Sequence, residues 1–304
     1  MSWRFITDYA KRRDWPLKVA DRLGRGRGRL RVLDDLIGPP PAKPPRVPDL
    51  AGWESRAFSA AWVGHATTLL RLGGLTFLTD PVFSTRVGLG FGLITGGPRR
   101  LVAPALAMPS LPRIDVVLLS HAHFDHLDRP TLARLPRATK IIAARGLRDL
   151  IDDLHFARVT ELSWGESTRV GDVVVTARPA RHWGARTFLD THRGYAALEL
   201  QAGRQRVLYG GDSAYHTEWR DVPAVDLAIL GIGAYDPYVA SHATPEQALE
   251  MADHLRAANV LPMHHATFRL SHEPVGEPIE RLLTATGRDE RRIIIRAIGG
   301  EWTP

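Results

Sequence analysis

Short apolar segments alternate with turns rich in Gly, Pro and Asp from residue 57 onward. Segments that are fully apolar, or that alternate apolar and polar residues, are typical of β-strands. A Gly-Gly pair between the second and third segments predicts a hairpin turn. The pattern predicts strands over 57–63, 66–72, 75–79, 114–120, 139–144, 172–177, 195–200, 204–210, 225–231 and 259–263.

Two segments have a helical pattern. Residues 244–258 form the clearer helix, because Thr244 can cap the first turn and Pro245 fits the first helical position. Residues 129–135 form a weaker one between two buried strands. Hairpins therefore come first, and strands alternating with helices follow. This order predicts a layered α/β fold in which helices cover two sheets.

The first 50 residues differ in composition from the rest of the chain. They contain 12 Lys and Arg against 6 Asp, which accounts for +6 of the net charge of +7. The proline-rich segment 39–48 is expected to be extended and to lack sheet hydrogen bonds. We therefore predict a basic arm at 1–50 and a folded domain at 51–304. The arm is either solvated or attracted to an anionic surface.

Composition argues against several classes of protein. No apolar run is long enough to span a membrane, and the first residues lack the apolar core of a secretion signal, so we predict a cytoplasmic protein. Residues 51–304 contain 28 basic and 27 acidic residues, which disfavours a nucleic-acid surface. The chain has no cysteine, so histidines and carboxylates must bind any metal. The oligomeric state stays open.

The stretch SHAHFDHLD at 120–128 contains three histidines and two aspartates directly after a buried strand. Alternate residues of an extended stretch face one way, so His121 and His123 can bind one ion together. The turn that follows redirects Asp125 and His126, which suggests a second ion. A loop of solvated histidines is the simpler interpretation, but four such groups within six positions favour metal binding.

Three further candidate ligands follow other predicted strands: His182, Asp212 and His264. Taken singly, each histidine is better interpreted as a structural residue with a hydrogen-bond partner. Together with the four above, the three residues supply enough ligands for two ions. His265 is the adjacent alternative to His264.

These stretches resemble successive motifs of the metallo-β-lactamase superfamily, in the branch that contains N-acylphosphatidylethanolamine-hydrolysing phospholipase D. SHAHFDHLD resembles the HxHxDH signature of the superfamily. The other matching stretches follow in the family's order over roughly residues 55–285: VGHATTLLRL, FLTDPVFS, PARHWGART, YGGDSAYH, GIGAYDP and MHHATF. The resemblance implies an αββα sandwich with metal ions at one edge of its two sheets.

The resemblance also implies how the ligands are shared between two zinc ions. It assigns His121, His123 and His182 to one ion and Asp125, His126 and His264 to the other, with Asp212 bridging the two. Ligands of this kind would also suit iron or manganese, so the native metal stays open.

Other residues are implied to support the site. Asp80 would hold a ligating imidazole, and His242, which precedes a helix N-terminus where anions are stabilised, would line the substrate site. Tyr235 would belong to the same pocket or to the packing around it. His65 could contact substrate, support a ligand or be a turn residue. We expect catalysis to depend on Asp125, Asp212, His65 and His242.

The resemblance favours hydrolysis of a phosphodiester in a phospholipid or similar molecule, by a metal-bound hydroxide. A lactonase of the ascorbate-lactone type would use the same ligands and is the first alternative. A non-catalytic scaffold at a membrane is the second. The arm and the apolar loop 86–101, which ends in Arg99 and Arg100, predict peripheral contact with an anionic membrane at its inner face.

Overall fold

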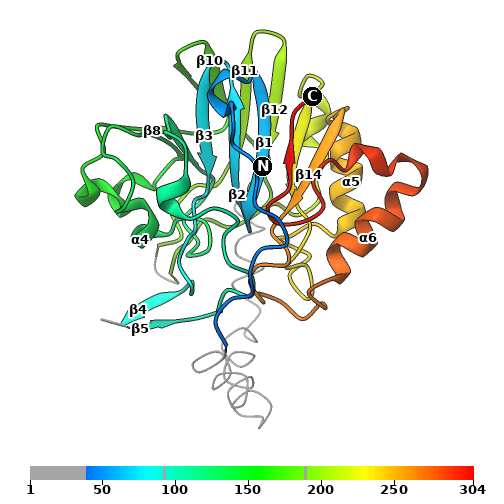
Figure 1. Ribbon diagram of the computed structural model, residues 1–304, viewed down its shortest axis with the longest axis horizontal. Helices are drawn as coiled ribbons and strands as arrows, with labels where there is room; N and C mark the ends of the chain where they lie inside the picture. Colours follow the sequence, from blue (N-terminus) through cyan, green and yellow to red (C-terminus); the bar gives the residue numbers. More distant parts are fainter. Residues whose placement is uncertain (1–38, 92–93, 188–189) are drawn as a thin grey trace. The chain divides into compact units, whose positions relative to one another are not determined.

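The computed structural model describes residues 39–91, 94–187 and 190–304. Most of the predicted basic arm, residues 1–38, therefore lies outside the described residues. Residues Pro41–Pro304 form one compact unit. Its strands make two large sheets and a separate two-stranded hairpin (Figure 1). The prediction of a layered α/β sandwich is confirmed.

The first sheet has seven strands in the order β15-β1-β2-β3-β6-β7-β8. Strands β1, β2 and β3 form antiparallel hairpins, and β3, β6, β7 and β8 run parallel. The predicted Gly-Gly turn joins β2 to β3, and both glycines have positive φ, 55° and 74°. The strands span Phe58–Gly64 (β1), Thr67–Leu72 (β2), Leu75–Thr79 (β3), Val116–Leu119 (β6), Lys140–Ala144 (β7), Arg158–Leu162 (β8) and Glu301–Trp302 (β15).

The second sheet has six strands in the order β14-β13-β12-β11-β10-β9. Strands β9 to β12 are antiparallel, whereas β12, β13 and β14 are parallel. They span Ser167–Val170 (β9), Val173–Arg178 (β10), Ala197–Ala202 (β11), Gln205–Tyr209 (β12), Leu227–Gly231 (β13) and Asn259–Met263 (β14). The separate hairpin consists of Leu89–Phe91 (β4) and Ile94–Gly96 (β5).

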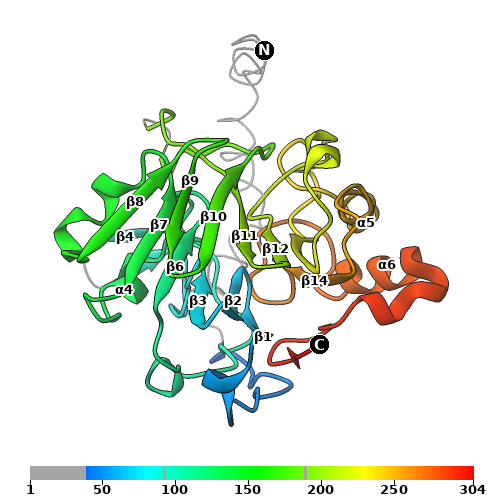
Figure 2. The same ribbon diagram turned by 90° about the horizontal axis from the view of Figure 1, so that it is seen from above.

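Two helices, α5 (Pro245–His254) and α6 (Glu277–Thr286), lie beside the β12 to β14 part of the second sheet (Figure 2). Helix α5 begins with a capping box between Thr244 and Gln247, as the predicted cap requires. The four-residue α4 (Arg129–Leu132) lies in the connection from β6 to β7 and is shorter than the predicted helix 129–135. Short 3₁₀ helices occupy Trp53–Ser55, Met108–Ser110, Arg148–Leu150, Asp152–Leu154, Glu218–Asp221 and Gly287–Arg292.

The apolar core lies mainly between the sheets. Strand β6 is buried along its whole length, as an all-apolar strand in a parallel sheet should be. Leu69 and Leu118 of the first sheet share this core with Val175 and Leu200 of the second. Because β1, β3, β6, β10, β12 and β14 all lead to the same edge of the sandwich, the loops that follow these strands meet there.

Two expectations about the loops are wrong. The proline-rich segment does form sheet-like hydrogen bonds, since Ala42 donates to Leu101 O and accepts from Ala103 N. Arg100, at the end of loop 86–101, is not an exposed cation for a bilayer contact, because it is only 2% exposed and its guanidinium donates to Val82 O and Ser84 O. Among the helices of the described ranges, none is long and apolar enough to cross a membrane.

Candidate metal centre

The candidate ligands all lie just beyond the carboxyl ends of strands. His121 to His126 follow β6, His182 follows β10, and Asp212 and His264 follow β12 and β14. Several of these junctions have unusual backbone geometry: φ is positive at His65, Asp80 and His264, at 54°, 29° and 62°. Non-glycine residues with positive φ are uncommon and gather at functional sites.

A first group of side chains contains His121, His123, His182 and Asp212, whose ligand atoms all lie within 4.8 Å of one another. His123 Nδ1 is 2.9 Å from His121 Nε2 and 3.2 Å from His182 Nε2. Asp212 Oδ2 lies 3.8 Å from the Nε2 atoms of His121 and His182. Three imidazole nitrogens and a carboxylate oxygen thus converge at the distances expected around one ion.

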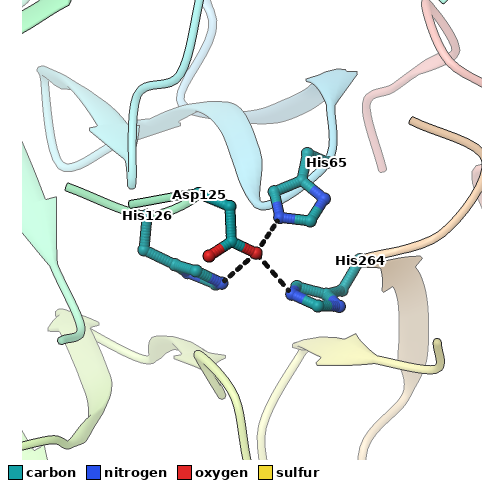
Figure 3. Close-up of side chains that lie close together, drawn as sticks. All are labelled: His65, Asp125, His126 and His264. Atoms are coloured by element: carbon teal, nitrogen blue, oxygen red, sulfur yellow. Dashed lines mark hydrogen bonds and ion pairs between the residues drawn. The ribbon is translucent and has the colours of Figure 1, made fainter. Parts of the chain in front are cut away.

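A second group contains His65, Asp125, His126 and His264, shown in Figure 3. Asp125 Oδ2 lies 2.9 Å from His65 Nε2, 3.4 Å from His264 Nε2 and 3.7 Å from His126 Nε2. His65 therefore belongs to this group. The sequence had left three roles open for it: contact with substrate, support of a ligand, or a place in a turn. Its Nε2 contacts the same carboxylate oxygen that faces the other imidazoles.

Asp212 lies between the two groups. Its Oδ2 is 3.1 Å from His126 Nε2 and 3.2 Å from His264 Nε2, in addition to its contacts in the first group. These short contacts lack hydrogen-bond geometry: the Nε2 atoms of His126 and His264, like the buried Oδ1 of Asp212, have no hydrogen-bond partner among the described residues. Buried polar atoms without partners are costly, and a bound cation would satisfy all three. The residues present therefore fit a pair of metal ions.

Asp80 supports the second group through His126. It accepts hydrogen bonds from His126 Nδ1 (2.6 Å), Ser120 N (2.8 Å), Ser120 Oγ (2.5 Å) and Tyr209 OH (2.5 Å). A ligating imidazole commonly donates its outer N–H to a carboxylate, which fixes the ring orientation. The sequence suggested this role for Asp80, but it did not reveal its partners: Ser120 follows the neighbouring strand β6 of the same sheet, and Tyr209 reaches Asp80 from the second sheet.

Burial and mutual repulsion keep several histidines neutral. Burial lowers the pKa of His123 and His65 to about 3. Burial also lowers the pKa of His121 well below its usual value, and the nearby His126 and His123 lower it further. Neutral imidazoles are the form that binds metal ions, so these side chains need not lose a proton first.

The carboxylates have the opposite effect on the other two histidines. Burial lowers the pKa of His264 and His126, but Asp212 and Asp125 outweigh it and raise the pKa of His264 to about 9 and that of His126 well above its usual value. Burial raises the pKa of Asp125 and Asp212, but His126 and its neighbours reverse this and hold both pKa values well below the usual range. Two ionised carboxylates thus create a strong preference for cations here.

His242 lies beside both groups. Its Nδ1 is 3.8 Å from Asp212 Oδ2, and its ring centroid is 5.0 Å from that of His182. The helix that follows offers less to an anion than the sequence suggested, because Pro245 has no N–H and Gln247 N donates to the capping Thr244. At this helix start, the side chain of His242 is therefore the group that lies near the ligand groups.

Two other candidates lie elsewhere. The hydroxyl of Tyr235 donates to Glu277 and its ring lies beneath Arg281, so Tyr235 attaches its loop to α6 and has no described contact with either ligand group. These contacts correspond to the packing role that the sequence left open for Tyr235, and a supporting role at the metal ions stays a prediction. His265 is in neither ligand group, and its ring packs against Trp62, with ring centroids 4.7 Å apart. Of the adjacent pair, His264 is the residue placed among the ligands.

Comparison with known proteins gives a consistent picture. A family described as Beta-lactamase superfamily domain matches residues 76–265. An uncharacterized protein of Mycobacterium tuberculosis is 33% identical over 254 residues, and the match covers 78% of this chain but only 66% of the relative. N-acyl-phosphatidylethanolamine-hydrolyzing phospholipase D 1 of Caenorhabditis elegans is 30% identical over 245 residues, covering 73% of this chain and 68% of the relative.

Solved structures share the fold. The isothiocyanate hydrolase from Delia radicum gut bacteria superimposes with a TM-score of 0.66 over 81% of this chain and 98% of its own, at 19% sequence identity. At that identity the likeness concerns the fold alone.

Proposed function

Since the chain belongs to the metallo-β-lactamase superfamily, we propose that it is a dinuclear zinc hydrolase that cleaves a phosphodiester in a phospholipid or similar molecule. The family and the converging His and Asp side chains support the coarser statement directly: this is a metal-dependent hydrolase. The two zinc ions and the phosphodiester are the proposal.

The position of Asp212 carries the proposal of two ions. One oxygen of this buried carboxylate lies within 3.8 Å of imidazole nitrogens from both ligand groups. A carboxylate that binds one metal ion alone would lie near the imidazoles of one ligand group only. His121, His123 and His182 would hold one ion, and Asp125, His126 and His264 the other.

Two observations support a phosphodiester as substrate. The relative from Caenorhabditis elegans, which is named as a phospholipase D, matches 73% of this chain. In addition, His242 lies beside Asp212 and is not needed to complete either group of four ligands. A neutral imidazole there can donate an N–H to a phosphate oxygen, because burial lowers the pKa of His242 well below its usual value.

When bound, a pair of divalent ions lowers the pKa of water and stabilises the attacking and leaving oxygens of an in-line displacement. The chain supplies orientation. Asp125 and Asp212 stay ionised and provide the negative charge that holds the cations. His65 donates its Nε2–H to Asp125 and so fixes the direction of that carboxylate. No serine or cysteine nucleophile is required, and the chain has no cysteine.

The experiment is a hydrolysis screen of the zinc-loaded protein with a phospholipid, a simple phosphodiester and a lactone, followed by reaction in oxygen-18 water. We expect turnover of the phosphodiesters, with the label in the phosphate-bearing product, since a solvent oxygen attaches to phosphorus and the alcohol leaves with its own oxygen. Label in the alcohol would mean carbon–oxygen cleavage. Lactone opening without phosphodiesterase activity would replace the proposal with the lactonase alternative.

A further inference from the structure

The ligating histidines differ in how their outer ring nitrogens are satisfied. His121 Nδ1 lies 2.9 Å from Ser120 Oγ, His126 Nδ1 lies 2.6 Å from Asp80, and His182 Nδ1 lies 2.9 Å from Ser241 O. These oxygens are the usual partners of metal-binding imidazoles, and they set the tautomer and the ring orientation.

His123 has no such oxygen. Its Nδ1 faces the other ligands, so its Nε2 is the outer nitrogen, and this atom is buried without a hydrogen-bond partner among the described residues. His264 Nδ1 is in the same situation, but the nearest ring to His264 is that of His65, itself part of the site. His123 instead meets a residue that neither ligand group contains.

That residue is Trp183, which follows His182 directly in the chain. Its ring centroid is 4.5 Å from that of His123, and the two planes are inclined by 63°, the arrangement in which the edge of one ring meets the face of another. The other two rings against His123, those of His121 and His182, lie on its Nδ1 side. Trp183 is 42% exposed, although an indole of this size would normally be buried.

We propose that Trp183 is a positioning residue for the metal ligand His123, and that the face of its indole accepts the Nε2–H of that imidazole. The face of an aromatic ring is negative and can accept a weak hydrogen bond from N–H. The indole also covers Nε2, which water would otherwise reach. Trp183 thus replaces the oxygen that the outer nitrogens of His121, His126 and His182 have.

This contact makes the two metal positions unequal. Loss of the outer partner of a ligating histidine typically weakens metal binding about 10- to 100-fold. An N–H···π contact is weaker than a carboxylate partner, so its removal belongs near the lower end of that range. The effect should fall on the ion bound by His121, His123 and His182 and spare the other ion. The inference rests on the metal pair of the proposed function, but not on its substrate.

The test compares zinc affinities of full-length variants by competition with a chelator. Trp183→Leu keeps an apolar cover but removes the ring face, Trp183→Phe keeps a ring face, and Trp164→Leu is the matched control. Trp164 is similarly exposed, at 47%, and its indole N–H donates to Tyr195 O with no described contact to a ligand. We expect Trp183→Leu to weaken one of the two zinc ions about 10-fold, Trp183→Phe to weaken it much less, and Trp164→Leu to have no effect.

The proton resonance of His123 Nε2–H in the unmutated, zinc-loaded protein gives a second measurement that needs no variant to fold. A proton above the indole face should be shifted upfield, whereas an oxygen acceptor would shift it downfield. A downfield resonance, or equal affinities in the Leu and Phe variants, would overturn the inference. If the unmutated protein fails to bind two zinc ions, the proposed function itself fails, so the two failures are distinguishable.

Discussion

At the scale of single residues, the site depends on side chains whose orientations are fixed by neighbours from other elements. Asp80 receives donors from both sheets, since Ser120 follows β6 and Tyr209 ends β12. This arrangement holds the ring of His126 with its Nε2 directed at Asp125 and Asp212. No side-chain hydrogen bond of His242 is described, and we propose that this side chain is the one that contacts substrate.

We expect His242→Ala to lower kcat for a phosphodiester about 100-fold, comparable to the loss of one donor to a developing oxyanion. Zinc content should stay at its unmutated value, because each proposed ion has four ligands without His242: three of its own and the bridging Asp212. Kinetics and elemental analysis of the same preparation check both parts. The exposed His192 provides a matched control, and His192→Ala should retain activity.

A loss of zinc in the His242→Ala variant would contradict this assignment. The ligand atoms of Asp212, His242 and His264 also lie within 4.8 Å of one another, so a metal-binding role for His242 is the competing interpretation.

The sequence predicted the metal ligands better than the residues that contact and orient those ligands. Ligand types and their places after strands can be recognised locally, because a strand followed at once by His or Asp is a pattern within a few residues. Tyr209 at the end of β12 and Trp183 in the loop after β10 gave no such signal, since an aromatic residue at such a position usually indicates packing. Their contacts with Asp80 and His123 arise only when separate segments meet.

At the scale of elements, Arg186 contacts the loop that contains His121, His123, Asp125 and His126 at several points. Arg186 Nη1 donates to Ala122 O at 2.7 Å and to Leu127 O at 2.9 Å. Its guanidinium also stacks on Phe124, 4.0 Å from the ring centroid. Arg186 thus binds the loop near both ends and links it to the segment that carries His182.

We expect Arg186→Met to destabilise the fold by about 2–3 kcal/mol, because two carbonyls lose a charge-assisted hydrogen bond. Thermal unfolding of the metal-free protein measures this. Arg148→Met is the control, since Arg148 pairs with Asp152 on the surface and such exposed pairs contribute at most about 1 kcal/mol. Equal destabilisation by the two substitutions would show that Arg186 does not hold the loop.

The success of prediction also varied among elements. The β2–β3 hairpin was predictable because two glycines with positive φ suit its turn. Strands β8 and β9 were missed, since their sequences RVTEL and STRV are partly exposed and lack an apolar run. Helix α5 ends at His254, four residues before the predicted end, because residues 255–258 instead lead into β14.

At the scale of the whole molecule, most of the net positive charge lies outside the described part of the chain. Residues 1–38 contain ten Lys and Arg and five Asp, whereas basic and acidic residues nearly balance in 51–304. The hairpin β4–β5 carries Leu89, which is 51% exposed. Since Arg100 is buried, the hairpin loses one of the cations that the sequence suggested for a bilayer contact. Attraction to an anionic membrane would therefore depend mainly on the arm.

We propose that the arm gives weak, salt-sensitive binding to anionic vesicles, which would place the protein at the inner face of a membrane. A basic residue close to such a surface contributes about 1 kcal/mol, and salt screens the attraction.

Flotation with vesicles of mixed phosphatidylserine and phosphatidylcholine should recover the full chain at low salt and lose it at high salt. A truncated chain should begin at Pro39 and not at Pro48, because Ala42 pairs with Leu101 and Ala103 and belongs to the folded unit. The truncated chain should stay unbound at both salt concentrations.

A full-length variant with Arg25, Arg27, Arg29 and Arg31 replaced by Gln separates charge from chain length, and we expect it to bind far less than the unmutated protein. If full-length and truncated chains float equally, the arm has no role in membrane contact, and the hairpin β4–β5 becomes the element to mutate next.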